Sequence, residues 1–272
     1  LFSDTQIHLG KMHSARAGVL RRFLSDLRFI GISAIIRLFW LGDRTKWKYG
    51  QDKNRVFFSF FPQMFDSSGR EEKFGSLIST NDQVAAFLLS DGMHQKPKLT
   101  SYFRNVKRAK EQGFEIIDRF LRWVDFQESL IWAWKLWRWY PVVRNQIPKY
   151  RDIDMSGMIQ TELRFSISRL IRLILLKGSV ERFLVDKKCA TEIYYYPVEY
   201  PLGRMISWIS STVRSDIHRW GFQMSPVSTR RLEQFLAEGE ASIGSPFISN
   251  APIPDSILAE DERSAGIYRY AG

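Results

Sequence analysis

Apolar residues in the first part of the chain repeat with the spacing of an α-helix. Between residues 15 and 41 they fall close to one stripe, arginines lie off that stripe, and Gly42-Asp43 follows as a helix-stop signal. Residues 159–177 repeat the pattern, with Arg169 and Arg172 away from the apolar face. The sequence therefore predicts two long, basic, amphipathic helices. The stripe of the first helix consists of Leu20, Phe23, Leu24, Leu27, Ala34, Leu38 and Leu41.

Short runs of β-favouring residues alternate with helical segments in the last third of the chain. Residues 192–196 end at Pro197, a helix is predicted at 202–214, and a second strand follows at 219–223. Strands separated by helices of this length are typical of βαβ units and a parallel sheet, in which ligands bind at the carboxyl ends of the strands. Further predicted strands lie at 55–61, 255–259 and 266–270, further helices at 82–90, 101–112, 180–187 and 229–237, and a surface loop at 66–82.

These elements predict an α/β fold, a Rossmann-like parallel sheet flanked by helices, with a helical N-terminal elaboration. We expect residues 1–50 to form a basic amphipathic helical segment. Residues 51–272 are expected to form the Rossmann-like domain, with a helical, tryptophan-rich insertion at about 115–180.

The charge balance favours anionic partners. Forty lysines and arginines against 29 aspartates and glutamates give a net charge of +11, which suits nucleic acid, acidic lipid head groups or phosphorylated substrates without choosing among them. The single cysteine, Cys189, excludes an intramolecular disulfide and a zinc–cysteine cluster. No apolar run approaches the roughly 20 residues that span a bilayer, and we find no signal peptide. We expect a cytoplasmic protein, with peripheral attachment to the inner face of the cytoplasmic membrane left open.

The first candidate for chemistry follows the strand at 192–196. Glu199 lies between Pro197 and Pro201, which stiffen the loop. A carboxylate held at the carboxyl end of a strand has the position of a general base for an acceptor hydroxyl. Arg204, near a helix N-terminus, is a candidate phosphate or carboxylate contact. The alternative is that Glu199 caps the helix and pairs with Arg204.

The second candidate follows the strand at 219–223. Gln223 and Ser225 are candidate hydrogen-bond partners for a sugar, and Ser228 is suited to cap the next helix. No phosphate-binding loop, dinucleotide-binding glycine motif, zinc-protease motif or hydrolase nucleophile elbow is present. Asp152-Ile153-Asp154 precedes a predicted helix instead of following a strand, so we assign no metal ligands.

The two segments together also resemble a known group of proteins. A strand ending in Tyr-Pro-x-Glu, a second strand containing Gly-Phe-Gln-x-Ser, and Pro-Ile-Pro-Asp-x-Ile-Leu at 252–258 resemble bacterial surface-carbohydrate biosynthesis proteins. Those proteins look like GT-B-type glycosyltransferases that transfer Kdo-like or sialic-acid-like sugars. The resemblance covers residues 192–259 and extends in part to the strand before Pro62.

The resemblance implies the acceptor-side half of a glycosyltransferase of surface-polysaccharide synthesis. The donor it implies is a nucleotide-linked sugar, with CMP-linked sugars among the candidates, and the acceptor is a glycan or a lipid-linked molecule; no further cofactor is expected. Met224 stands where the pattern has a histidine, so a role of that histidine does not transfer. The second domain of such enzymes, which usually binds the donor, has no counterpart in these 272 residues.

Aromatic and basic residues gather between 132 and 140. Such a stretch suits the head-group zone of a membrane, and it equally suits a packed core with solvated charges. Two other classes of function stay open: a non-catalytic, membrane-associated scaffold of polysaccharide assembly, and a basic nucleic-acid-binding protein. The candidate membrane-surface residues are Trp132, Trp134, Lys135, Trp137, Arg138 and Trp139.

Overall fold

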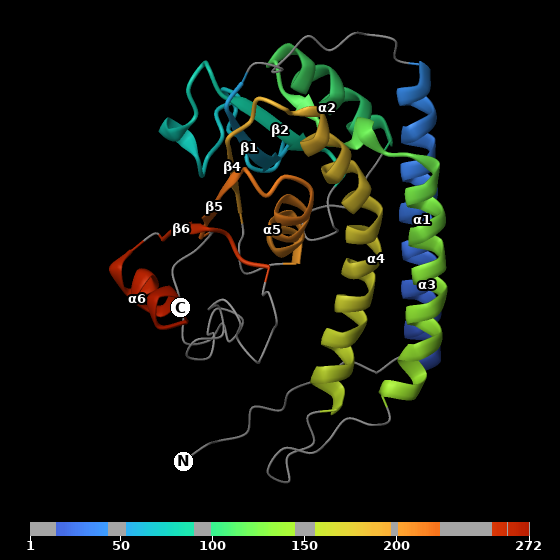
Figure 1. Ribbon diagram of the computed structural model, residues 1–272. Coiled ribbons are helices and arrows are strands. Elements are labelled where there is room, and N and C mark those ends of the chain that lie inside the picture. The colour runs from blue at the N-terminus through green and yellow to red at the C-terminus, as the bar shows by residue number, and fades with distance from the viewer. Residues whose placement is uncertain are drawn as a thin grey trace.

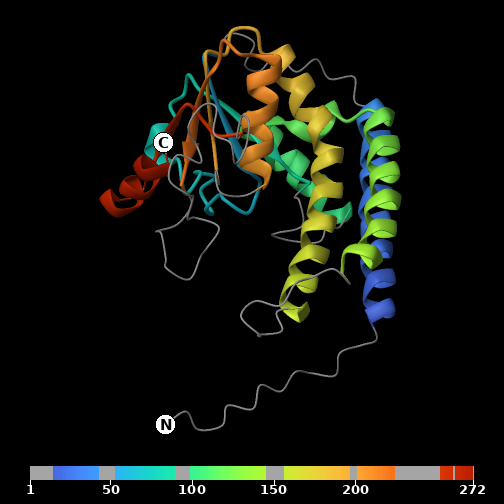
Figure 2. The same ribbon diagram turned by 60° about the horizontal axis from the view of Figure 1, so that its bottom comes forward.

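The computed structural model places a parallel sheet beside three long helices (Figure 1). The long helices are α1 (Ala15–Gly42), α3 (Trp123–Val143) and α4 (Ser156–Asp186). Turning the molecule by 60° keeps them together as a bundle at the side of the sheet (Figure 2). The structure describes residues 15–42, 53–89, 99–144, 156–196, 201–223, 252–259 and 261–271.

The sheet has six strands in the order β3-β2-β1-β4-β5-β6, and every neighbouring pair is parallel. The chain starts at the centre, runs outward through β2 and β3, and returns across α3 and α4 to β4 on the other side of β1. The strand order therefore reverses between β1 and β4, which confirms the predicted α/β fold with a Rossmann-like sheet. The strands are β1 (Arg55–Phe60), β2 (Gln83–Phe87), β3 (Glu115–Ile116), β4 (Glu192–Tyr195), β5 (His218–Phe222) and β6 (Ser256–Leu258).

Aromatic side chains fill the core on both faces of the sheet. On one face Phe58 of β1 meets Phe183 of α4, with ring centroids 5.5 Å apart. On the other face Phe57 stacks on Tyr194 at 4.4 Å, and Phe74 closes over them from the connection after β1. The remaining described elements are η1 (Gly75–Leu77), α2 (Leu99–Glu111), η2 (Ile117–Phe120), α5 (Pro201–Val213) and α6 (Glu262–Ala271).

Two predicted elements have the wrong type. Residues 83–87 form the central strand β2 and not a helix, because their apolar run is buried on both sides between β1 and β3. Residues 262–271 form α6 and not a short strand. Asp261 starts that helix, since its Oδ1 accepts the backbone N–H of Ser264 over 2.7 Å.

Two other boundaries also differ from the sequence prediction. The helices predicted at 159–177 and 180–187 are one helix, α4, which continues through Gly178. The connection at 66–82 is not wholly a surface loop, because Glu71 and Phe74 are buried against the sheet. The predicted helix at 229–237 lies outside the described residues.

The apolar stripe predicted for α1 faces mostly outward. Four leucines of this stripe are more than half exposed: Leu20, Leu24, Leu38 and Leu41. The buried side of α1 is formed instead by Asp26, Phe29, Ile30, Ser33, Ile36 and Trp40. In the described part of the chain no helix is long and apolar enough to cross a membrane.

Candidate functional site

The carboxyl ends of β1 and β4 meet where the strand order reverses, and a buried polar cluster lies there. Glu71 Oε1 accepts a hydrogen bond from the Tyr196 hydroxyl over 2.7 Å and from Ser59 over 3.1 Å. The two hydroxyls lie 2.7 Å apart. Glu71 Oε2 accepts the backbone N–H of Phe74. The cluster therefore ties the connection after β1 to the ends of both strands.

This cluster holds the start of the segment that contains Glu199. Burial, and then the neighbouring Glu71 carboxylate, raise the pKa of Tyr196 well above its usual range, so its hydroxyl stays protonated and continues to donate. Tyr196 is the last described residue before Pro197, and Glu199 lies outside the described residues. The general-base role of Glu199 stays a prediction.

Arg204 lines a cavity of about 350 Å³ between α4 and α5. Leu170, Leu173 and Ile174 contribute apolar walls from α4, and Pro201 marks the amino end of α5 at the same cavity. The Lys177 ammonium lies 5.3 Å from the ring centroid of Trp208 at this cavity. No ion pair joins Arg204 to another described residue. An apolar cavity with two cations suits an amphiphilic, anionic ligand.

Gln223 lies apart from this cavity. It is fully buried at the end of β5, and its amide donates to the Ser264 hydroxyl of α6 over 3.1 Å. In this structure the side chain joins β5 to α6, and its proposed contact with a sugar stays untested. Ser225 and Ser228 lie outside the described residues.

Asp118 is a second buried carboxyl near the carboxyl end of β2. Its Oδ2 accepts the backbone N–H groups of Leu88 and Leu89, and also the Tyr102 hydroxyl over 3.1 Å. Tyr102 in turn accepts the Trp40 indole N–H over 3.0 Å, which connects α1 to this end of the sheet. Burial raises the pKa of Asp118 to about 7. Sequence reasoning missed this residue, because only the folding of α1 and α2 over β2 removes it from water.

The tryptophan-rich helix α3 divides between surface and interior. Trp134 is 62% exposed, Trp132 and Trp139 are also exposed, and the Lys135 ammonium lies 5.3 Å from the ring centroid of Trp132. Trp137 does not belong to this surface: it is 6% exposed, and its indole N–H donates to Asp26 of α1. Arg138 is exposed, so five of the six predicted surface residues lie at the surface: Trp132, Trp134, Lys135, Arg138 and Trp139.

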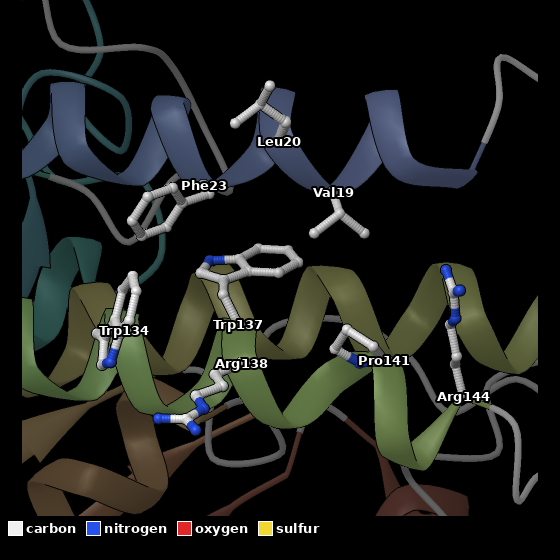
Figure 3. A pocket seen from close by; sticks show the side chains of 8 residues that line it. All are labelled: Val19, Leu20, Phe23, Trp134, Trp137, Arg138, Pro141 and Arg144. Atoms are coloured by element: carbon white, nitrogen blue, oxygen red, sulfur yellow. The ribbon is translucent and has the colours of Figure 1, made fainter.

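The groove between α1 and α3 is open and apolar. One cavity of about 620 Å³ is lined by Val19, Leu20 and Phe23 of α1 together with Trp134 and Pro141 of α3 (Figure 3). Arg138, next to Trp137 near the middle of the groove, and Arg144, beyond Pro141 at one end, also line this cavity (Figure 3). A second cavity of about 460 Å³ lies further along the same pair of helices, between residues 27–34 and 123–130. Leu20 of α1 lines the first cavity and the partly buried Leu27 lines the second, so α1 and α3 present a mostly apolar surface between them, with two arginines at the first cavity.

No group of three or more His, Cys, Asp or Glu side chains that could hold a metal ion occurs within the described ranges. His218, for example, is a neighbour of Ser256 at 3.1 Å, and Asp152 and Asp154 lie outside those ranges. Comparisons with protein-family models, with curated proteins and with solved structures found no match.

Proposed function

We propose that this chain supplies the acceptor-binding half of a glycosyltransferase that acts on an amphiphilic acceptor at a membrane surface. The observation that carries this proposal is the Arg204 cavity. It lies at the amino end of α5, the helix that follows the carboxyl end of β4, and it combines apolar walls with Arg204 and Lys177. Ligands of doubly wound sheets bind at this edge.

The cavity fits an acceptor that joins an apolar chain to an anionic group. Apolar side chains of α4 would bury the chain, and the Arg204 guanidinium would bind the anionic group with charge-assisted hydrogen bonds. Trp208 adds an aromatic face on which a sugar ring can pack. This chemistry supports a lipid-linked acceptor more than a free polysaccharide.

The proposed reaction uses Glu199 as the general base. Its carboxylate removes the proton of an acceptor hydroxyl, the acceptor oxygen attacks the anomeric carbon of the donor sugar, and the bond from that carbon to the nucleotide phosphate breaks. The nucleotide leaves with the bonding electrons; for a CMP-linked sugar it leaves as CMP. The donor would be bound mainly by a partner domain, as the resemblance of residues 192–259 implies.

The bundle supports the membrane location in this proposal. The exposed Leu20 of α1 and the exposed Trp134 of α3 line one apolar groove, together with Arg138 and Arg144. Tryptophan and arginine favour the head-group zone, and apolar side chains favour the acyl region next to it. A transferase with this surface would meet a lipid-linked acceptor where that acceptor resides.

The experiment is an assay of nucleotide release by the native full-length protein, with CMP- and UDP-linked sugars and a lipid-linked acceptor. We expect acceptor-dependent release, and we expect Arg204→Gln to raise the KM for the acceptor by about tenfold or more, because a hydrogen bond to a charged group contributes roughly 1.5–3 kcal/mol. Arg104→Gln on α2, which is exposed and removes the same charge, is the matched control. Absence of both transfer and nucleotide binding would instead favour the scaffold function.

A further inference from the structure

Another pocket, with a different lining, lies between α1 and α4, on the side of α1 away from its groove with α3. It has a volume of about 340 Å³, and three arginines line it: Arg21 and Arg28 of α1 and Arg172 of α4. Ser25 adds a hydroxyl between the two α1 arginines, and Phe29 forms part of the apolar lining. This pocket shares no lining residue with the Arg204 cavity.

Among the described residues, the three arginines of this pocket carry more charge than the single carboxylate paired with them. Asp26 lies 3.5 Å from Arg172 and is the one carboxylate in an ion pair with any of the three arginines within the described ranges. Arg21 and Arg28 have no ion pair with a described residue, and both are exposed. Arg172 also lies over the Phe29 ring, 4.9 Å from its centroid, which fixes its guanidinium at the pocket.

Further arginines strengthen the positive field. Arg22 lies 4.1 Å from the ring centroid of Phe165 on α4. Burial, and then repulsion from Arg164, Arg172 and Arg21, lower the pKa of Arg22, whereas Asp26 opposes this change. Cations that raise one another's energy in this way gain from a bound anion, because the anion reduces their mutual repulsion.

We propose that the pocket of Arg21, Arg28 and Arg172 binds the phosphate group of an anionic phospholipid. Arginine matches a phosphate with paired N–H donors, and Ser25 can donate a further hydrogen bond. Arg28 lies seven positions after Arg21, which places the two residues about 10 Å apart along the helix axis and on the same flank. The two arginines therefore line the pocket from positions about two turns apart on the same side of α1.

The source of the phosphate is a lipid because the pocket opens beside apolar surface. Leu24 lines the pocket and is 54% exposed, and Leu20, one turn before it, is 58% exposed. A soluble phosphate compound would leave these side chains in water, whereas a phospholipid would cover them with its acyl chains while its phosphate reaches the arginines. The arginines thus complement the phosphate of a phospholipid, and the exposed leucines complement its acyl chains.

This inference rests on the membrane-facing part of the proposed function and is independent of sugar transfer. The test is co-sedimentation of the whole chain with vesicles of phosphatidylcholine alone, and with vesicles in which about one lipid in five is phosphatidylglycerol. We expect stronger binding to the anionic vesicles, and Arg21→Gln/Arg28→Gln to weaken that binding roughly thirtyfold, since each near-surface arginine contributes roughly fivefold.

Arg104→Gln/Lys188→Gln removes two exposed charges at residues that do not line the pocket and serves as the control, with the melting temperature of each variant showing that it folds. Little loss in the control supports the pocket, and an equal loss in both variants overturns it, because general charge would then explain binding. Glycerol 3-phosphate that displaces the protein from anionic vesicles at millimolar concentration would overturn the lipid as the ligand.

No binding to either vesicle would overturn this inference and the membrane location together. It would leave the transferase proposal to the nucleotide-release assay with a detergent-dispersed acceptor. Transfer without vesicle binding, and vesicle binding without transfer, are therefore separate and distinguishable results.

Discussion

The indole N–H of Trp137 donates to Asp26 Oδ2 over 3.0 Å and thereby joins α3 to α1 inside the helical bundle. The same oxygen accepts the Ser168 hydroxyl of α4 over 2.9 Å, so one carboxylate contacts all three long helices. Burial raises the pKa of Asp26, whereas the hydrogen bonds from Trp137 and Ser168 and the Arg172 charge lower it. The hydrogen bonds of Asp26 to Trp137 and Ser168 therefore fix how the three helices align along an otherwise apolar bundle.

Trp137→Phe should lower the free energy of unfolding by about 1–3 kcal/mol, because it removes a donor from a buried carboxylate and leaves space beside it. Trp139→Phe is the matched control on the same helix, since Trp139 is half exposed, and it should change stability by less than about 0.5 kcal/mol. Urea unfolding followed by circular dichroism measures both. Equal stability of the two variants would refute the structural role of Trp137.

Gly178 should not tolerate a methyl group. A Cβ at this position in α4 would overlap the Asp125 carboxylate of α3. It would also approach the guanidinium of Arg182, the residue that forms an ion pair with Asp125. Gly178→Ala is expected to destabilise the protein by about 1–3 kcal/mol through overpacking.

Gly31→Ala on α1 is the control for the same substitution, because nothing lies within 4 Å of a Cβ there. It should stabilise by about 0.5–1 kcal/mol, the helix preference of alanine over glycine. Thermal or urea unfolding of both variants checks the pair, and a stabilised Gly178→Ala variant would contradict the close approach of α3 and α4.

Asp118 should make stability depend on pH between about 4 and 7. Its pKa is about 7 in the folded protein and about 3.9 when unfolded. In that window the folded state therefore binds more protons, so the stability contributed by this group is complete below pH about 4 and is lost as the pH rises to about 7. The loss is on the order of 4 kcal/mol.

Other carboxyls titrate in the same range, so the measurement is the difference in unfolding free energy between the natural protein and Asp118→Asn across that window. As the pH rises, the unfolding free energy of the natural protein should fall relative to that of Asp118→Asn. A difference that is flat with pH would show that Asp118 is not protonated near neutrality in the folded protein.

Glu199→Gln should lower the rate of sugar transfer by about 10²–10⁴-fold, because an amide cannot accept the hydroxyl proton. The melting temperature should change little. Glu111→Gln, an exposed residue of α2, is the control of equal charge. Full activity of Glu199→Gln would remove Glu199 from the mechanism, and a large fall in melting temperature would point to the alternative of helix capping.

The sequence predicted the sheet better than it predicted which side of α1 is buried. Strands β1 and β4 are runs rich in aromatic residues with a proline two residues after their ends, and such local signals do not depend on tertiary contacts. The buried side of α1 does depend on them, because it contains Asp26 and Ser33, whose partners come from α4 or the helix backbone. Periodicity alone therefore selected the leucine stripe that the structure leaves exposed.

Strand β2 and Glu71 were missed for related reasons. Val84-Ala85-Ala86-Phe87 contains good helix formers, and only pairing with β1 and β3 makes it a strand. Glu71 follows a Ser- and Gly-rich stretch typical of a surface loop, yet it is buried by Tyr196, which is distant in sequence. The sequence could point only to the carboxyl ends of the strands, because these ends meet at one edge in any doubly wound fold, and the role of the predicted site residues there stays a prediction.

Helix α4 belongs to both parts of the molecule. Ser129 of α3 donates to the Ile171 carbonyl in its middle, and Phe183 near its end packs on Phe58 of the sheet. Its 31 residues extend about 46 Å as a single rod. Because one helix is part of both, the orientation of the bundle also determines the orientation of the sheet. A membrane surface that binds α1 would therefore also determine the direction from which a second molecule can approach Arg204.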